Sequence, residues 1–370
     1  MSKRGNHEAN IRFRKKEKRW EASLMVGYWP DGRRRRISVY GKTRKDVLEK
    51  MDQLKQDIDL GIDITNNQTF RDVANLWLAQ HQVAASTHKH YQFLLKPILA
   101  EFGNCTIASI LPHHLEAFLI NLAASQHSDS YIRKIKSLLT MIFAKAKKNR
   151  WIRSNPASDL ENIKSQVPKT PREHFTLEEM QKLHISMPYD LISDSIRLLM
   201  GTGIRLGELL AINKSSFSKD CDILHVQKAV KQIGGKISIG VPKSKASIRD
   251  IVIPEAFRPA AKRLLDLCAD KDYLWEIGIP GQPCHESYFR KLFKRSVESI
   301  LGPISKTPHA VRHGYATVLA NSSNNISGKT IQCLLGHANQ RVAEEVYIHP
   351  DAKNQQAAAD ALSNAFLQQT

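Results

Sequence analysis

Two short polar segments divide the chain. Residues 61–68 read G-I-D-I-T-N-N-Q, and residues 155–171 contain three prolines and few apolar side chains. Segments of this composition are typical of linkers, because they offer little that could pack in a core. A chain of 370 residues is also long enough for two or three domains. We therefore expect a multidomain protein whose parts are residues 1–65, 66–168 and 169–370.

The first part is predicted to hold a small sheet and one helix. Apolar residues alternate with others over 20–28, which is the period of a half-buried strand. The sequence W-P-D-G at 29–32 supplies a turn, and 33–40 resume as a second strand. Thr43 and Asp46 have the pattern of a capping box, and apolar residues at helical spacing follow them.

A cluster of four arginines follows the turn of the predicted hairpin and begins its second strand. Basic residues outnumber acidic ones by 55 to 36 in the whole chain, a formal charge of +19 that favours a polyanion such as nucleic acid. Arginines at a strand end beside aromatic residues could reach both phosphates and base edges of DNA, and a solvated strand tip is the alternative. The predicted DNA contacts are Arg33, Arg34, Arg35 and Arg36.

The middle part reads as four or five helices. Apolar residues recur at helical spacing near 70–79, 86–101, 112–123 and 128–149. On the last of these helices several lysines, including Lys136 and Lys147, lie largely off the apolar face. We expect this basic face to contact DNA phosphates, with a solvated surface as the alternative.

The third part is predicted to be mainly helical. It opens with T-L-E-E at 176–179, which has the pattern of a capping box. A strand-like stretch runs between Ile223 and Pro254, where Gly234 and Gly235 mark a turn. The chain then reads helical to its end, so we expect helices around a small antiparallel sheet.

The stretch T-P-H-A-V-R-H-G-Y, which starts at Thr307, has two histidines four residues apart. Zinc-binding helices share that spacing but need a glutamate where Ala310 stands, so we predict no metal site. Thr307 and Pro308 resemble the start of a helix, which places His309 and Arg312 on its first turn. Free N–H groups, an imidazole and a guanidinium there could receive a phosphate. On this stretch alone, a core histidine with a surface arginine is an equal alternative.

Four more motifs lie in the third part. G-T-G-I-R-L-G-E-L-L contains Arg205, P-K-S-K-A-S contains Lys243, L-L-G-H ends in His337, and E-E-V-Y-I-H-P contains Tyr347. Taken together, R-x-x-E, K-x-K, H-x-x-R-H, G-H and Y resemble, in order and spacing, the tyrosine recombinase (phage integrase) family. The resemblance covers the whole third part.

The resemblance implies a multidomain α+β fold. Residues 1–65 would form a three-stranded sheet plus helix that binds arm-type DNA sites. Residues 66–168 would form an all-helical core-binding domain and linker, and residues 169–370 the catalytic domain. R-W-E-A, W-P-D-G-R-R-R-R and K-T-R-K in the first part look like the arm-binding domains of integrases from lambdoid phages and conjugative transposons.

The resemblance also implies a catalytic set. Arg205 and Arg312 would grip the scissile phosphate, and His309 and His337 would donate further hydrogen bonds. Tyr347 would attack phosphorus and form a 3′-phosphotyrosyl bond. Because that intermediate conserves the energy of the broken bond, no cofactor is expected, neither ATP nor a metal.

The identity of the lysine is open, and two further residues near the motifs need an interpretation. A lysine would protonate the departing 5′ oxygen, and the family pattern favours Lys243 over Lys245. Tyr315 is the rival nucleophile, but it lies on the predicted helix of Arg312 and is expected in the core. Glu208 is expected to support Arg205 without a direct chemical role.

The function implied is a site-specific DNA recombinase that integrates and excises a phage genome or another mobile element. Its expected partners are double-stranded attachment sites, a homotetramer on two DNA duplexes, and DNA-bending and excision accessory proteins. The alternatives are a chromosome-dimer-resolving recombinase and a catalytically silent DNA-binding relative. The tail at 357–367 is expected to form a helix that packs on a neighbouring protomer or on its own domain.

The ends and cysteines of the chain bear on its location. The polar start lacks the apolar stretch of a signal peptide, and no apolar run is long enough to span a membrane. We expect a cytoplasmic, nucleoid-associated protein with no membrane partner. The five cysteines are far apart and form no C-x-x-C pair, so reduced thiols are expected.

Overall fold

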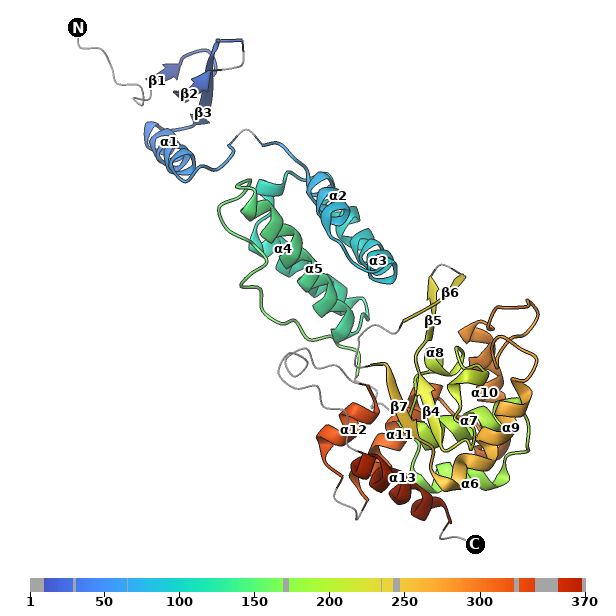
Figure 1. The fold of residues 1–370 in the computed structure, drawn as a ribbon. Coiled ribbons are helices and arrows are strands. Elements are labelled where there is room, and N and C mark those ends of the chain that lie inside the picture. Colours follow the sequence, from blue (N-terminus) through green and yellow to red (C-terminus); the bar gives the residue numbers. More distant parts are fainter. Residues whose placement is uncertain are drawn as a thin grey trace. The chain divides into compact units, whose positions relative to one another are not determined.

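The structure, a computed structural model, describes residues 10–28, 31–64, 66–168, 173–233, 235–241, 247–322, 326–336 and 352–367. The chain folds into two units, residues 1–169 and 170–370 (Figure 1). Within the described ranges, no helix is both long and apolar enough to cross a membrane.

The N-terminal sheet has three antiparallel strands in the order β1-β2-β3. They are β1 (Asn10–Arg14), β2 (Arg19–Tyr28) and β3 (Arg34–Gly41), and helix α1 (Arg44–Asp59) follows them. Ala22 and Leu24 of β2 pack with Val47 and Met51 of α1 in a small buried core. The Thr43 side chain caps α1, as the capping pattern predicts. The two predicted strands and the helix are confirmed, and β1 supplies the third strand.

A helical bundle forms the rest of the first unit. Its helices are α2 (Phe70–Gln80), α3 (Ala85–Phe102), α4 (Pro112–Ala124) and α5 (Asp129–Lys148). Their apolar faces share one core, in which the Phe70 ring lies 6.5 Å from that of Phe102 and 5.6 Å from that of Phe143. The four predicted helices are confirmed, because residues at helical spacing bury one continuous face.

The segment after α5 is more firmly packed than its composition indicates. Ala157 and Leu160 are buried in the core of the bundle. Asn155 Nδ2 donates to the carbonyl of Thr140 at 3.0 Å, and Lys136 Nζ donates to the carbonyl of Leu160. A side chain and a backbone carbonyl of α5 thus satisfy polar groups of a segment that reads as a linker by sequence.

The second unit is mainly helical, as predicted. Its helices are α6 (Leu177–Ser186), α7 (Leu191–Thr202), α8 (Leu206–Leu209), α9 (Arg258–Leu267), α10 (Glu286–Leu301), α11 (Pro308–Ala320), α12 (Gly328–Leu334) and α13 (Ala352–Leu367). Helix α7 runs through the middle of this unit and packs against α9, α10 and α11 (Figure 1). Every residue from Ser193 to Thr202 is buried. The end of α7 is therefore held firmly in place.

Two small antiparallel sheets flank the helices. Strand β4 (Ile223–Val226) pairs with β7 (Arg249–Val252), and β5 (Ala229–Ile233) pairs with β6 (Lys236–Gly240). The strand-like stretch predicted between residues 223 and 254 is confirmed. It forms two separate pairs of strands among the described residues rather than one sheet.

Helix α13 packs on its own unit. Gln181 Nε2 of α6 donates to the carbonyl of Ala365 at 2.6 Å. The Phe366 ring lies 4.9 Å from the Phe257 ring, and Leu362 is buried. Of the two alternatives for the tail, this single chain shows the helix folded back on its own domain.

Candidate active site

Arg205 stands at the junction between α7 and α8. Gly203 ends α7 in the left-handed region, with φ 60°, and a Cβ there would lie 2.5 Å from the Tyr315 ring. The turn therefore needs glycine on both counts. It leaves Arg205 as the N-cap residue of α8, with its side chain 38% exposed. A ligand in solvent can reach this guanidinium.

Arg312 extends from α11 toward the same turn. Its Nη1 donates to the carbonyl of Gly203 at 2.7 Å, and its Nη2 donates to the carbonyl of Leu335. Arg205 Nη2 donates to the next carbonyl, that of Gly336, at 2.8 Å. The structure thus brings together the two arginines that the sequence predicts to grip a phosphate.

His309 lies on the first turn of α11 and is exposed. Thr307 occupies the N-cap position as predicted, although its side chain makes no capping hydrogen bond. The rings of His309 and His313 meet edge to face, with their centroids 4.7 Å apart. Among the described residues, no group of three or more His, Cys, Asp or Glu side chains is placed to hold a metal ion.

Glu208 orients Arg205. Its Oε1 accepts from Arg205 Nη1 at 2.7 Å, and its Oε2 accepts from the Arg205 backbone N–H at 2.9 Å. Burial by itself would raise the pKa of Glu208, but Arg249 and Arg205 outweigh it and hold this pKa below its ordinary value. Glu208 therefore remains an anion, and its contacts agree with the predicted support of Arg205; that it has no direct chemical role stays a prediction.

Arg249 is a charged group of the site that the motifs do not single out. Its Nη2 donates to Glu208 Oε2 at 3.0 Å, and its side chain is 6% exposed. One sequence signal could have found it. The strand period places Arg249 on the same face as Ile251 and Ile253, and all three are buried. A charged residue on a buried face needs a partner of opposite charge.

Among the described residues, positive charge exceeds negative charge at this site. The guanidiniums of Arg205 and Arg249 both pair with the buried carboxylate of Glu208, and the charge of that carboxylate also acts on Arg312. Burial, and then repulsion from Arg205, lowers the pKa of Arg312 to about 9. A bound anion would relieve this repulsion, and a tetrahedral phosphate can accept several of these N–H donors at once.

Three predicted catalytic residues, Lys243, His337 and Tyr347, lie outside the described residues, as does the alternative lysine, Lys245. Their roles stay predictions. The chain on one side of His337 is described, however, because Gly336 ends the segment that Arg205 holds. Gly336 has a φ of 60°, the left-handed conformation that commonly follows a helix.

Tyr315 packs in the core. Its side chain is 2% exposed, and burial raises its pKa well above the ordinary value of a tyrosine. A buried phenol is neither accessible to DNA nor easily ionised. The expectation that Tyr315 is a core residue is confirmed.

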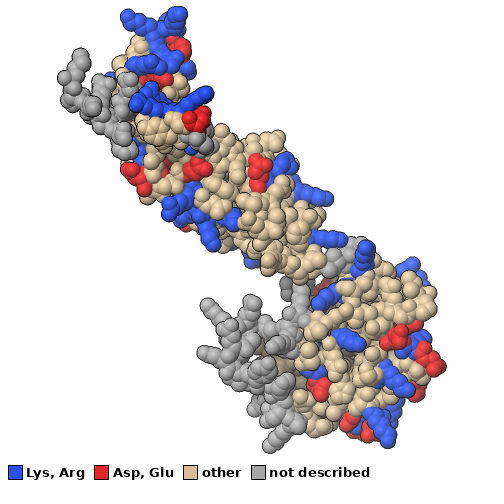
Figure 2. All heavy atoms as spheres, turned by 45° about the horizontal axis from the view of Figure 1, so that its top comes forward, with Lys and Arg blue, Asp and Glu red and all other residues tan. Residues whose placement is uncertain are grey.

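The arginines at the start of β3 lie on different faces of the sheet. Strand alternation directs Arg34 and Arg36 away from α1, whereas Arg35 lies on the side that faces α1. Arg33 precedes the strand and forms an exposed ion pair with Asp31. Figure 2 shows lysine and arginine side chains gathered over this sheet. Contacts of these arginines with DNA stay predictions.

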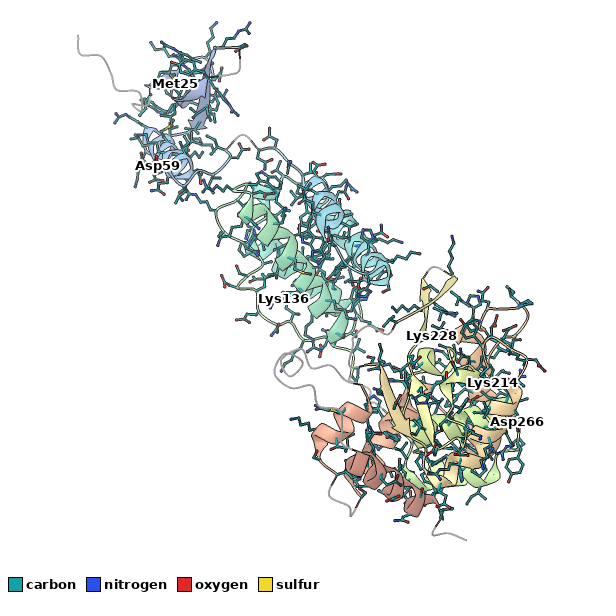
Figure 3. All side chains as sticks on the ribbon, in the orientation of Figure 1. Met25, Asp59, Lys136, Lys214, Lys228 and Asp266 are labelled. Atoms are coloured by element: carbon teal, nitrogen blue, oxygen red, sulfur yellow. The ribbon has the colours of Figure 1, made fainter. Side chains whose placement is uncertain are left out.

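The face of the sheet opposite α1 has a carboxylate near its centre. Glu21 accepts from Arg14 Nε at 2.6 Å, Arg12 Nε at 2.7 Å and the Tyr40 hydroxyl at 3.3 Å. The contact with Arg14, followed by that with Arg12, lowers the pKa of Glu21 to about 2. Met25, labelled in Figure 3, lies on the same sheet. On the outer face of the sheet, Glu21 therefore orients the guanidiniums of Arg12 and Arg14.

The two lysines predicted on α5 differ in their surroundings. Lys136, labelled in Figure 3, donates to the carbonyl of Leu160 and to Asn162 Oδ1 at 3.1 Å. Lys147 is exposed. Because the ammonium of Lys136 already has acceptors within its own unit, Lys147 is the better placed of the two for a phosphate.

Comparison with known proteins identifies relatives of the chain. Residues 173–354 match the family described as the phage integrase family. A tyrosine recombinase XerC-like protein of Caldanaerobacter subterraneus is 25% identical over 94% of this chain and 96% of its own length. The ICEBs1 integrase of Bacillus subtilis is 22% identical, over 93% and 97%. Tyrosine recombinase XerC of Alcanivorax borkumensis is 30% identical, over 74% and 86%.

Two solved structures share the fold. The Tn1549 transposon integrase in complex with a circular intermediate DNA is 22% identical, and the match covers 78% of this chain and 98% of that one, with a TM-score of 0.61. A lambda integrase tetramer bound to a Holliday junction is 18% identical, over 89% and 95%, with a TM-score of 0.56. The predicted multidomain α+β fold is confirmed.

Proposed function

Because the chain belongs to the phage integrase family of tyrosine recombinases, we propose that it is a site-specific DNA recombinase for the integration and excision of a phage or another mobile element. One observation carries the proposal. Arg205 and Arg312 converge where positive charge is in excess, and Arg205 is open to solvent. This arrangement suits the scissile phosphate of a DNA strand.

The reaction consists of two transfers of one phosphoryl group. Arg205, Arg312 and His309 stabilise the negative charge that grows on the non-bridging oxygens, and His337 adds a further hydrogen bond. Tyr347 gives up its hydroxyl proton with the help of His309, and its oxygen forms a bond to phosphorus while the bond from phosphorus to the 5′ oxygen breaks. Lys243 gives that oxygen its proton. Attack by the 5′ hydroxyl of another strand reverses these steps and releases Tyr347.

Integration and excision are the first candidate, because the ICEBs1 integrase matches 93% of this chain. Length does not separate the candidates, since a XerC-like protein matches 94% of the chain and the XerC of Alcanivorax 74%. A recombinase that resolves chromosome dimers is the second candidate, since two relatives carry XerC names. The N-terminal sheet favours integration and excision, because a basic domain of this kind is expected to bind arm-type DNA sites in addition to the core site. A catalytically silent relative is expected to have lost one of the catalytic positions, and all six candidate residues are present in the sequence.

The proposed partners are double-stranded attachment sites and three further copies of the chain on two DNA duplexes. A lambda integrase tetramer on a Holliday junction shares the fold and supports this assembly. DNA-bending and excision proteins complete the proposed complex. The reaction takes place in the cytoplasm, at the nucleoid.

We assign residues 1–65 to arm-type DNA sites, residues 66–168 to the core site and residues 169–370 to catalysis. Removing residues 1–65 should leave covalent cleavage of a core site intact and abolish integrative recombination. The test compares the truncated chain with the full-length chain in strand transfer, first on a core-only substrate and then on a full attachment site. The matched point variant is Arg34→Ser with Arg36→Ser, which alters only the outer face of β3 and should act in the same direction. Equal loss on both substrates would show that this part belongs to the core-binding fold.

Affinity for attachment-site DNA should fall steeply with salt. A protein that neutralises 6–10 phosphates loses about 10³- to 10⁵-fold in affinity between roughly 50 and 200 mM salt. Fluorescence anisotropy over this range measures the slope of log affinity against log salt concentration. Lys147→Gln should make that slope shallower by about one, the contribution of one phosphate contact. A flat dependence would contradict binding through the DNA backbone.

A further inference from the structure

Three arginines end on three successive carbonyls. Arg249 Nε donates to the carbonyl of Leu334 at 2.8 Å, Arg312 Nη2 to that of Leu335, and Arg205 Nη2 to that of Gly336 at 2.8 Å. These carbonyls form the C-terminal end of α12. The last carbonyls of a helix lack partners within it and carry partial negative charge, so they bind cations well. The chain continues from Gly336 directly to His337.

The three arginines differ in how far they can reach DNA. The Arg205 side chain is 38% exposed, whereas that of Arg249 is 6% exposed. The N–H groups of Arg249 donate to acceptors inside the protein. These are the carbonyls of Leu334 and of Ser247, the latter at 3.1 Å, and both oxygens of Glu208 at 3.0 and 3.4 Å. Arg249 therefore has no direct route to a phosphate.

Of two groups that hold the Arg205 side chain, Arg249 bonds one directly and bonds the backbone close to the other. The first is Glu208, which accepts from the Arg205 guanidinium through Oε1, from the Arg205 backbone N–H through Oε2, and from Arg249 through both oxygens. The second is the carbonyl of Gly336, two residues beyond the carbonyl that Arg249 fixes. Removing Arg249 would leave Glu208 with one cationic partner, and the carboxylate would draw Arg205 inward. It would also release the end of α12.

We propose that Arg249 is a positioning residue for DNA cleavage, which acts through Glu208 and the end of α12 to aim Arg205 at the scissile phosphate. The inference rests on the proposed function. It adds a residue of β7 to the site, and it explains why a charged side chain lies on the buried face of that strand. Small errors in placement matter, because a shift of about 1 Å in a group of this kind can cost 10²-fold in rate.

The first test measures the single-turnover rate of covalent adduct formation by the full-length chain on a nicked attachment-site duplex at saturating DNA. Arg249→Gln should slow this step about 10- to 100-fold, in line with the loss of hydrogen bonds to a buried charge, while DNA affinity stays the same. Arg249→Lys keeps a cation at the position and should recover part of the rate. If the glutamine variant does not fold, the rate of the lysine variant is compared with that of the wild type instead.

A double-mutant cycle tests the route of the effect. If Arg249 acts through Glu208, the Arg249→Gln, Glu208→Gln double variant should be about as slow as the slower single variant. Effects that multiply would overturn the proposed route.

Arg263→Gln is the matched control, because Arg263 also pairs with a buried carboxylate, that of Asp194, through two contacts of 2.7 Å. It should lower the melting temperature and leave the cleavage rate of the folded enzyme unchanged. Equal slowing by the Arg263 and Arg249 variants, or an unchanged rate for Arg249→Gln, would reduce Arg249 to a structural residue. A wild-type chain that forms no adduct would instead overturn the proposed function.

Discussion

Tyr347→Phe should bind attachment-site DNA as tightly as the wild type and form no covalent adduct. The substitution removes one hydroxyl oxygen, and that oxygen is the atom proposed to bond to phosphorus. The DNA contacts assigned to arginines and lysines are untouched, so affinity should be unchanged. A duplex nicked beside the cleavage site traps the covalent intermediate of the wild type, because the short released strand diffuses away. Denaturing electrophoresis then counts protein joined to DNA.

Tyr315→Phe is the control for this experiment. Its side chain is buried, so loss of its hydroxyl should leave the adduct in place. An adduct that persists in Tyr347→Phe and disappears in Tyr315→Phe would move the nucleophile to Tyr315. It would also require the core around Gly203 to open on DNA, since the Tyr315 ring fills the space beside that turn.

Arg312→Lys should reduce the rate of adduct formation by about 10²- to 10³-fold, the usual cost of removing one donor to a developing oxyanion. Lysine keeps the positive charge but cannot reproduce the planar fork, which holds the carbonyls of Gly203 and Leu335 and still has N–H groups to offer. DNA affinity should change little, because many other cations contact the backbone. Single-turnover cleavage and anisotropy, measured well below the melting temperature, separate the two effects.

Arg197→Lys provides a matched control for the loss of a buried arginine. Arg197 is also buried, at 2% exposure, and also donates to carbonyls, those of His184 at 3.1 Å and Pro188 at 2.9 Å. Its replacement should cost stability and spare cleavage. If Arg197→Lys and Arg312→Lys slow cleavage equally, the effect of Arg312 is one of folding, and its grip on the phosphate is refuted.

Local structure was predictable because its causes lie within a few residues. Thr43, Thr69 and Thr176 each cap a helix through a side chain that accepts from a backbone N–H three residues on. Such a cap contributes about 1 kcal/mol and depends on no distant partner. The helical faces and the alternation in β2 follow in the same way from the spacing of apolar residues. The position of His309 on the first turn of α11 was likewise evident from the threonine and proline before it. Arg312, predicted on the same turn, is the fifth residue of the helix and lies at the start of its second turn.

Packing beyond the sequence neighbourhood was less predictable. The polar composition after α5 predicts a linker, yet Ala157 and Leu160 enter the core, because α5 supplies donors and acceptors for that backbone. The four arginines that begin at Arg33 read as one cluster, yet strand alternation separates Arg35 from Arg34 and Arg36. In the first case the deciding partner lies on another element, whereas in the second the two-residue period of the strand itself separates the side chains.

By itself the sequence determined the order of the elements, the family and the identity of the candidate catalytic groups, since all of these depend on short motifs and their spacing. Only the tertiary structure decided what each charged group touches. Arg205 reaches Gly336 across 131 positions, and Arg249 reaches Glu208 across 41. Hydrogen bonds need atoms within about 3 Å of each other, and spacing along a chain does not specify that distance between separate elements. The fold specifies it, and with it the surplus of positive charge among the described residues of this turn, on which the proposed phosphate site rests.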